Sequence, residues 1–175
     1  MSSATSAKNR RVALLIGRVI LAGIFLFAAY AKLRPQIPDT PWSAAAIKTS
    51  LSFFAMEVNS FQLLSDSQVS FVAHTLPFAE LMLGLWLLSG WQLPFSGAAA
   101  SALLAGLFGV MVRTYVRGLE INCGCFGPGE RLGIGSLLRD ASMLAFALAV
   151  TAVAFVSRPE SGSTAGAETE SRETA

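Results

Sequence analysis

Four apolar runs, each about twenty residues long, leave this chain few ways to fold other than across a lipid bilayer. They are Val12–Ala31, Val69–Trp91, Phe95–Val112 and Ile134–Val156. Charged residues make up only 14% of the sequence, whereas a soluble domain carries about a quarter, and the mean hydropathy is +0.56. The sequence therefore predicts an all-α integral membrane protein, a bundle of four transmembrane helices spanning residues 12–156.

The first run follows a polar segment, residues 1–11, that ends in basic side chains. A cleaved signal peptide is one alternative, because Ala29-Tyr30-Ala31 resembles a cleavage site. The run is long for a signal peptide and contains Arg18, which favours a retained span. The Arg34-Pro35 pair should end the helix, since proline disfavours helical backbone in the residue before it.

A further helix is predicted between the first two spans, over Trp42–Leu64. Apolar residues recur there at alternating spacings of four and three, as on one face of a helix: Ile47, Leu51, Phe54, Val58 and Phe61. Lys48 and Glu57 make the segment too polar to cross a bilayer. We expect an amphipathic helix that lies in the membrane interface or covers one end of the bundle; a plain connecting helix is the alternative.

Both cysteines of the chain, Cys123 and Cys125, fall in the loop Ile121–Gly129. A disulfide needs Cα atoms roughly 4.4–6.8 Å apart. A bridge between cysteines separated by one residue therefore requires a bend in the backbone, which Gly124 allows because it lacks a Cβ. Strained disulfides are readily reduced, which favours a redox-cycling pair. Metal binding remains open, although two thiolates are too few for a closed zinc site, as does a turn without chemistry.

A carboxylate in the middle of a span, Glu80, requires either a proton or a partner. Lys32, at the loop end of the first span, can approach it from the same side, whereas Arg18 lies too far along the helix. The pair is interpreted either as part of a proton relay or quinone pocket, or as an ion pair that fixes helix register. We expect His74, toward the loop side, to be an interfacial residue rather than a ligand.

Further charges lie near the cysteine loop in sequence: Arg113, Arg117 and the adjacent pair Arg139-Asp140. Cationic neighbours lower a thiol's pKa and raise the fraction of reactive thiolate. The preceding helix C-terminus has the opposite effect, because its dipole disfavours an anion. Anchoring of helix ends at the lipid headgroups is the alternative role for these charges.

An even number of spans places both termini on one side of the membrane and the cysteine loop on the other. Lys8, Arg10 and Arg11 precede the first span, which favours a cytoplasmic N-terminus. A disulfide persists in an oxidising compartment, which likewise places the loop on the outer face of the plasma membrane. The tail, residues 157–175, is rich in Ser, Gly, Thr, Ala and Glu and is expected to be disordered.

The string Cys123-Gly124-Cys125-Phe126-Gly127, preceded by Arg117-Gly118 and followed by Arg139-Asp140, resembles the MauE family of methylamine-utilisation proteins. Arg18, the Phe25–Lys32 stretch and Leu76-Pro77-x-x-Glu80-x-x-x-Gly84 are similar to the broader DoxX-like group. The resemblance covers about residues 12–156. It implies a four-helix membrane protein that matures the disulfide-rich small subunit of methylamine dehydrogenase.

The leading hypothesis is a membrane thiol–disulfide oxidoreductase or maturation factor, with Cys123 and Cys125 as the reactive pair and no metal. Gly124, Phe126 and Gly127 would shape the loop, and the partner would be a periplasmic cysteine-containing or thioredoxin-like protein. A looser analogy to vitamin K epoxide reductase, resting on architecture alone, implies a membrane quinone as electron acceptor.

A non-catalytic assembly subunit is the main alternative. A solute transporter using Glu80 is disfavoured by the few polar residues in the spans. The net charge of +2 gives no indication of nucleic-acid binding.

Overall fold

The computed structural model describes residues 2–37, 41–119, 121–122 and 131–157, with side chains from residue 8 onward. These residues form five helices and a single isolated β-bridge. The helices are α1 (Ser2–Leu33), α2 (Ala44–Ser60), α3 (Asp66–Ser89), α4 (Leu93–Val116) and α5 (Ile134–Val156). All but α2 are long and apolar enough to cross a membrane. The predicted class, an all-α membrane bundle with four spans and one additional helix, is confirmed.

Local sequence explains where the helices begin and end. The first helix ends at Leu33, two residues before Pro35, because proline disfavours helical backbone in the residue preceding it. Ser43 starts α2 by accepting a hydrogen bond from the Ala46 amide at 3.1 Å, the usual contribution of a serine N-cap. Gly90 ends α3 with φ of +70°, a left-handed conformation that glycine adopts without steric cost.

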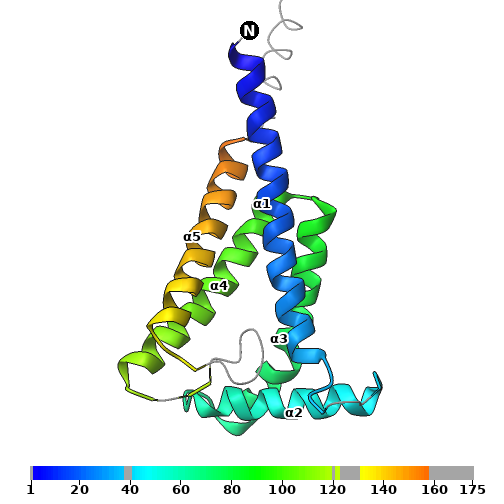
Figure 1. Cartoon of the computed structure of the whole chain (residues 1–175), viewed down its shortest axis with the longest axis vertical. Coiled ribbons are helices and arrows are strands. Elements are labelled where there is room, and N and C mark those ends of the chain that lie inside the picture. The colour runs from blue at the N-terminus through cyan, green and yellow to red at the C-terminus, as the bar shows by residue number, and fades with distance from the viewer. Residues whose placement is uncertain (1, 38–40, 120, 123–130, 158–175) are drawn as a thin grey trace, which may run out of the picture.

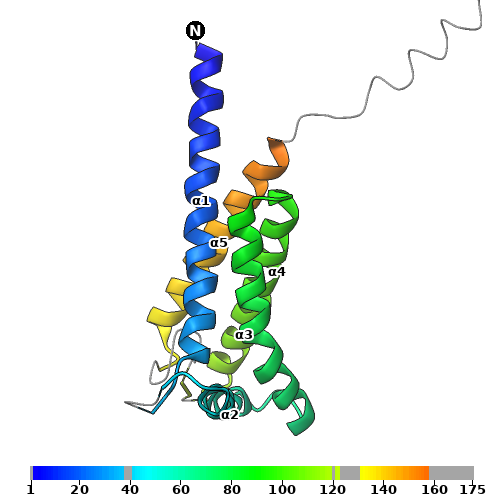
Figure 2. The same cartoon turned by 90° about the vertical axis from the view of Figure 1, so that its right-hand side faces the viewer.

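The four long helices run side by side, and α2 lies across one end of them (Figures 1 and 2). The most extensive packing joins α1 to α3 and α4 to α5. The N-terminus of α1 and the C-terminal end of α5 lie at the end opposite α2 (Figure 1). The C-terminal end of α4 and the start of α5 lie at the α2 end (Figure 1).

The covering helix α2 is amphipathic, as its apolar spacing predicts. Its buried residues are Ala46, Ser50, Leu51 and Phe54, whereas Phe53 and Met56 are 42% and 61% exposed on other faces. The Ser50 hydroxyl donates a hydrogen bond of 2.7 Å to the carbonyl of Arg34, just beyond α1. Of the two expected locations, the structure supports a helix that covers the end of the bundle.

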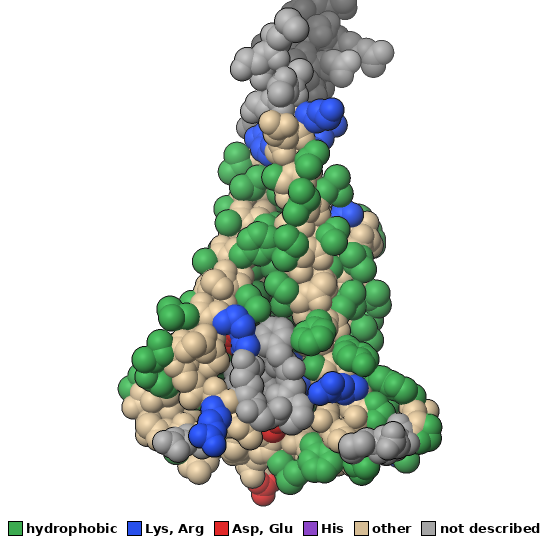
Figure 3. Space-filling model, in the orientation of Figure 1, with side chains coloured by type: hydrophobic (Ala, Val, Ile, Leu, Met, Phe, Trp, Pro, Cys, Tyr) green, Lys and Arg blue, Asp and Glu red, His purple; other side chains and the backbone are tan. Residues whose placement is uncertain are grey.

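The interior of the bundle is a cluster of apolar side chains from the four long helices: Leu21, Ala22, Phe25, Leu83, Leu87, Ala100, Ala147 and Val150. Large hydrophobic side chains also lie on the outside, as Figure 3 illustrates along the length of one face. An apolar exterior of this extent requires a lipid environment, because a soluble monomer rarely exposes large contiguous apolar patches.

Close helix approach occurs where glycine faces a neighbouring helix. A Cβ built on Gly84 of α3 would lie 2.8 Å from Leu26 Cγ of α1, and one on Gly97 of α4 would lie 2.7 Å from Thr151 Oγ1 of α5. Small residues permit such approach between membrane helices. The two helix pairs with the most extensive packing are therefore each fitted around a glycine.

Candidate functional site

The residues at the centre of the sequence hypothesis, Cys123, Gly124, Cys125, Phe126 and Gly127, lie outside the part of the chain that the structure describes. The predictions made for them, a strained redox-active disulfide in a glycine-shaped loop, therefore stay predictions. The tail from residue 158 onward also lies outside the described residues, so its expected disorder stays a prediction too. The structure does describe the chain on either side of the cysteine segment.

An antiparallel β-bridge joins Asn122 to Arg131 on the two sides of the cysteine segment. Beside it, the Leu132 amide donates a hydrogen bond of 2.8 Å to the Ile121 carbonyl. The ends of residues 123–130 are thereby held next to each other, so the segment leaves and re-enters the fold at one point. The bridge thus closes a loop of residues 123–130, and the entropic cost of closing a loop grows with its length.

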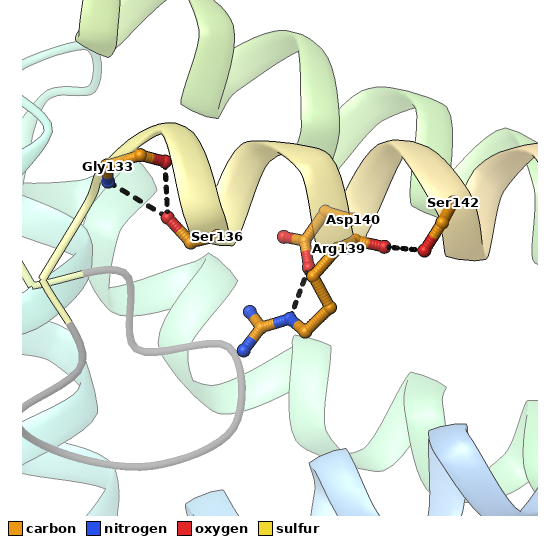
Figure 4. Close-up of polar contacts among 5 residues, drawn as sticks. All are labelled: Gly133, Ser136, Arg139, Asp140 and Ser142. Atoms are coloured by element: carbon orange, nitrogen blue, oxygen red, sulfur yellow. Dashed lines mark hydrogen bonds and ion pairs between the residues drawn. The ribbon is translucent and has the colours of Figure 1, made fainter.

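Arg139 and Asp140, in the second turn of α5, pair with each other (Figure 4). Arg139 Nε lies 3.0 Å from Asp140 Oδ1. One turn earlier the Ser136 hydroxyl accepts a hydrogen bond of 2.9 Å from the Gly133 amide, which satisfies a backbone donor at the start of the helix. The guanidinium charge of Arg139 is thus partly balanced by its neighbour, which weakens its predicted effect on a thiol.

Arg117, another of the cations named from sequence, bonds elsewhere. Its Nη1 donates to the Gln62 carbonyl at 3.4 Å, across the link between α2 and α3. Gln62 has φ of +52°, an uncommon conformation for a residue other than glycine. This contact ties the end of α4 to the connection that follows the covering helix, which is an anchoring role.

The buried pair predicted from sequence is present. Lys32 Nζ lies 3.0 Å from Oε1 and 2.9 Å from Oε2 of Glu80, and the two side chains are 4% and 2% exposed. The ammonium also lies 5.5 Å from the centroid of the Phe54 ring of α2, within the range of a cation–π interaction. The pair therefore joins α1 to α3 beneath α2.

The position of Glu80 follows from the sequence of α3. The buried residues Ala73, Pro77, Glu80, Gly84 and Leu87 repeat at alternating spacings of four and three, which places them on one helical face. That face packs on α1. Pro77, Glu80 and Gly84 of the DoxX-like motif noted in the sequence thus lie on the face of α3 that meets the first helix.

Arg18, the cation weighed against Lys32 as a partner for Glu80, lies at the opposite end of the same interface. A Cβ on Gly90 would collide with its guanidinium, so Arg18 packs over the C-terminal end of α3. A cation is favoured there by the helix dipole. The expectation that Lys32 rather than Arg18 partners Glu80 is confirmed.

Glu57 was not singled out from sequence as a site residue, although it belongs to this cluster. It is partly buried on α2, and burial raises the pKa of its carboxyl above the ordinary value, while attraction to the Lys32 ammonium offsets part of that rise. A signal was available in the sequence. Glu57 follows Phe54 by three residues and precedes Phe61 by four, so it falls within the apolar stripe of α2.

His74 is exposed on α3, and its Nδ1 lies 2.8 Å from the Ser70 carbonyl of the same helix. Among the described residues no three His, Cys, Asp or Glu side chains gather in a way that could hold a metal ion. The histidine position agrees with the interfacial role expected for it.

Four long apolar helices, two of them joined by a buried ion pair, define a multi-pass membrane protein. Residues 10–154 match the family model described as Methylamine utilisation protein MauE, and the chain belongs to that family. It is 34% identical over 146 residues to the Methylamine utilization protein MauE of Paracoccus versutus, a match covering 81% of this chain and 70% of the relative. No solved structure matches the chain.

Proposed function

We propose that this protein is a membrane thiol–disulfide oxidoreductase of the MauE type that acts in methylamine utilisation. In this proposal Cys123 and Cys125 form disulfides in a periplasmic partner, the small subunit of methylamine dehydrogenase. The observation that carries it is the bridge between Asn122 and Arg131. This bridge holds at one point the ends of a segment that contains both cysteines of the chain.

The proposed chemistry is thiol–disulfide exchange. A partner thiolate attacks the Cys123–Cys125 disulfide, a mixed disulfide forms, and the second partner thiol releases it. The partner gains a disulfide and this protein is left with two thiols, so two electrons and two protons move between them. Reoxidation of the pair requires an acceptor, for which a membrane quinone or a thioredoxin-like protein is the proposed class.

In this proposal the charged residues next to the cysteine segment have a structural role. Arg117 fixes the end of α4 to Gln62, and the Arg139–Asp140 pair lies early in α5. These contacts fix the ends of the two helices, α4 and α5, that the cysteine segment connects. Orientation follows the same reasoning: the termini are cytoplasmic, and the loop and α2 face the compartment in which disulfides persist.

The reduction potential of the cysteine pair tests this proposal. Structural disulfides have potentials below about −300 mV, whereas strained, exchanging ones are more oxidising. The purified full chain, equilibrated with glutathione and dithiothreitol buffers and then alkylated, should titrate above about −300 mV. Gly124→Val should hinder closure and raise the potential further, because the bend between the cysteines becomes costly and the disulfide is destabilised relative to the dithiol.

His74→Gln serves as the matched control for this measurement, since His74 is exposed and bonds within its own helix. It should leave the potential unchanged. A pair that stays reduced in every buffer, or that titrates below about −300 mV, contradicts the exchange mechanism. That result would favour a non-catalytic assembly subunit.

A further inference from the structure

An apolar cavity of about 290 Å³ lies among α1, α2, α3 and α4, under the covering helix. Every residue that lines it is apolar except Lys32 and Glu80, which form its polar end. Phe54 and Phe61 contribute aromatic rings to its wall. A mostly apolar cavity with a few convergent polar groups is the common form of a small-molecule site.

The charge of the cavity limits its occupant. Lys32 and Glu80 carry opposite charges and contact each other at 2.9 Å, so the polar end has no net charge with which to hold an ion. Moving an uncompensated charge into apolar surroundings is costly. Water is also a poor occupant, because each buried water needs two to four polar partners. The cavity therefore favours an uncharged, largely apolar molecule.

The size and lining of the cavity favour a compact ring. A dry apolar cavity of about 150 Å³ already admits benzene, so about 290 Å³ accommodates a single ring with several substituents. The Phe54 and Phe61 rings offer the offset or edge-to-face contacts that aromatic groups prefer.

The unused hydrogen-bonding capacity of the polar end is that of an acceptor. A carboxylate has about four lone-pair sites, and the hydrogen bonds from Lys32 to Glu80 use one on each oxygen. A ligand that completes the site therefore brings a donor, and for an uncharged ring the natural donor is a hydroxyl.

We propose that this cavity binds an uncharged, lipid-soluble ring compound whose hydroxyl donates a hydrogen bond to the Glu80 carboxylate. Phenols and the hydroquinone form of membrane quinones share this chemistry. The hydroquinone assignment rests on the proposed function. Oxidation of the Cys123 and Cys125 thiols to a disulfide releases two electrons and two protons, and a quinone that takes up both becomes the hydroquinone, with two hydroxyls.

Calorimetric titration of the purified full chain in detergent tests the site with three probes. These are tetramethylhydroquinone, tetramethylphenol and the dimethyl ether of tetramethylhydroquinone, which keeps the ring but has no donor. We expect the hydroquinone to bind at least about tenfold more tightly than the ether, because a hydrogen bond to a charged group is stronger than one between neutral groups. Equal binding of hydroquinone and ether would overturn the assignment to Glu80.

Two variants of α2 locate the binding. Val58→Trp places a bulky side chain on the cavity wall and should weaken hydroquinone binding at least about tenfold. Phe53→Trp, on an exposed face of the same helix, should leave the affinity unchanged. Equal affinities in wild type and Val58→Trp would show that the ligand binds elsewhere and would overturn the proposal.

The remaining arms separate the ligand source and the proposed function. Tighter binding of hydroquinone than of the phenol assigns the site to the quinone class, and the reverse order assigns it to phenols; either order supports the cavity. A variant with both cysteines changed to serine should bind hydroquinone as wild type does. Failure of the cysteine chemistry would therefore leave the binding result intact, and failure of binding would leave the cysteine chemistry open.

Discussion

Lys32 Nζ contacts both carboxylate oxygens of Glu80, at 3.0 and 2.9 Å, and so joins the end of α1 to the middle of α3 inside the membrane domain. Both side chains are almost fully removed from the surface. Buried pairs of this kind lose much of their Coulombic attraction to desolvation, yet removing one partner leaves an uncompensated buried charge. The pair is therefore best examined by mutating its members singly and together.

Glu80→Gln should lower the free energy of unfolding in detergent by about 3–5 kcal/mol, because it leaves the buried Lys32 ammonium without its counter-ion. The double variant Lys32→Met/Glu80→Gln should recover much of that loss, since both charges are removed. Unfolding titrations of the wild type, both single variants and the double variant form the cycle. Purely additive losses would show that the two residues are not coupled.

Gly84→Ala should destabilise the α1–α3 interface by about 1–3 kcal/mol, the usual cost of overpacking. The added Cβ would lie 2.8 Å from Leu26 Cγ and 3.3 Å from the Ala22 carbonyl oxygen. Gly106→Ala is the matched control, because a Cβ there meets nothing within 4 Å. It should be neutral or stabilising, as alanine is the better helix former. Equal effects of the two variants would contradict the packing described for Gly84.

Glu57 should make stability depend on pH. Its folded-state pKa is raised above 4.5, mainly by burial, so the folded protein binds this proton more tightly than the unfolded chain does. The ionised carboxylate then costs stability at neutral pH, and the cost disappears as the pH falls through the folded pKa toward 4.5. Glu57→Gln should be more stable than wild type at neutral pH.

Thermal unfolding from pH 4 to 8 measures this effect. The advantage of Glu57→Gln should shrink as the pH is lowered, and Lys48→Gln, which removes an exposed charge from the same helix, should have no such trend. A constant difference between Glu57→Gln and wild type across that range would contradict the burial argument.

The membrane orientation can be tested with a membrane-impermeant maleimide. In intact cells whose thiols have been reduced, Cys125 should be labelled, because the proposed orientation places the cysteine loop on the outer face. A Cys123→Ser background leaves Cys125 as the single thiol, since the chain has only two cysteines. Labelling that occurs only after lysis would reverse the orientation.

The helices of this protein could be predicted from sequence because their determinants are local. Runs of apolar residues long enough to span a bilayer define α3, α4 and α5 to within four residues, and Pro35 marks the end of α1. The start of α1 was predicted wrongly, because the helix continues through the polar N-terminal segment to Ser2, ten residues before Val12. The Lys32–Glu80 pair was predictable as well, since a carboxylate inside a span needs a partner and Lys32 lies at the matching end of its helix.

Other features depend on how the helices pack, which the sequence alone does not determine. The cavity under α2 and the proximity of Glu57 to Lys32 follow from the path of the covering helix. The partners of Arg117 and Arg139 could not be chosen from sequence either. Their nearness to the cysteines along the chain indicated a role in thiol chemistry, whereas their described contacts are to Gln62 and Asp140.

The most direct test of the proposed function is the oxidation state of the partner in cells that carry cysteine variants of this protein. Cys123→Ser and Cys125→Ser should each reduce the fraction of disulfide-bonded methylamine dehydrogenase small subunit to that of a deletion strain. Membrane levels and unfolding temperature should stay at wild-type values, because a disulfide closing so short a loop contributes little stability. A mixed disulfide with the partner in one serine variant would add direct support. Wild-type oxidation of the partner in both serine variants would contradict the account.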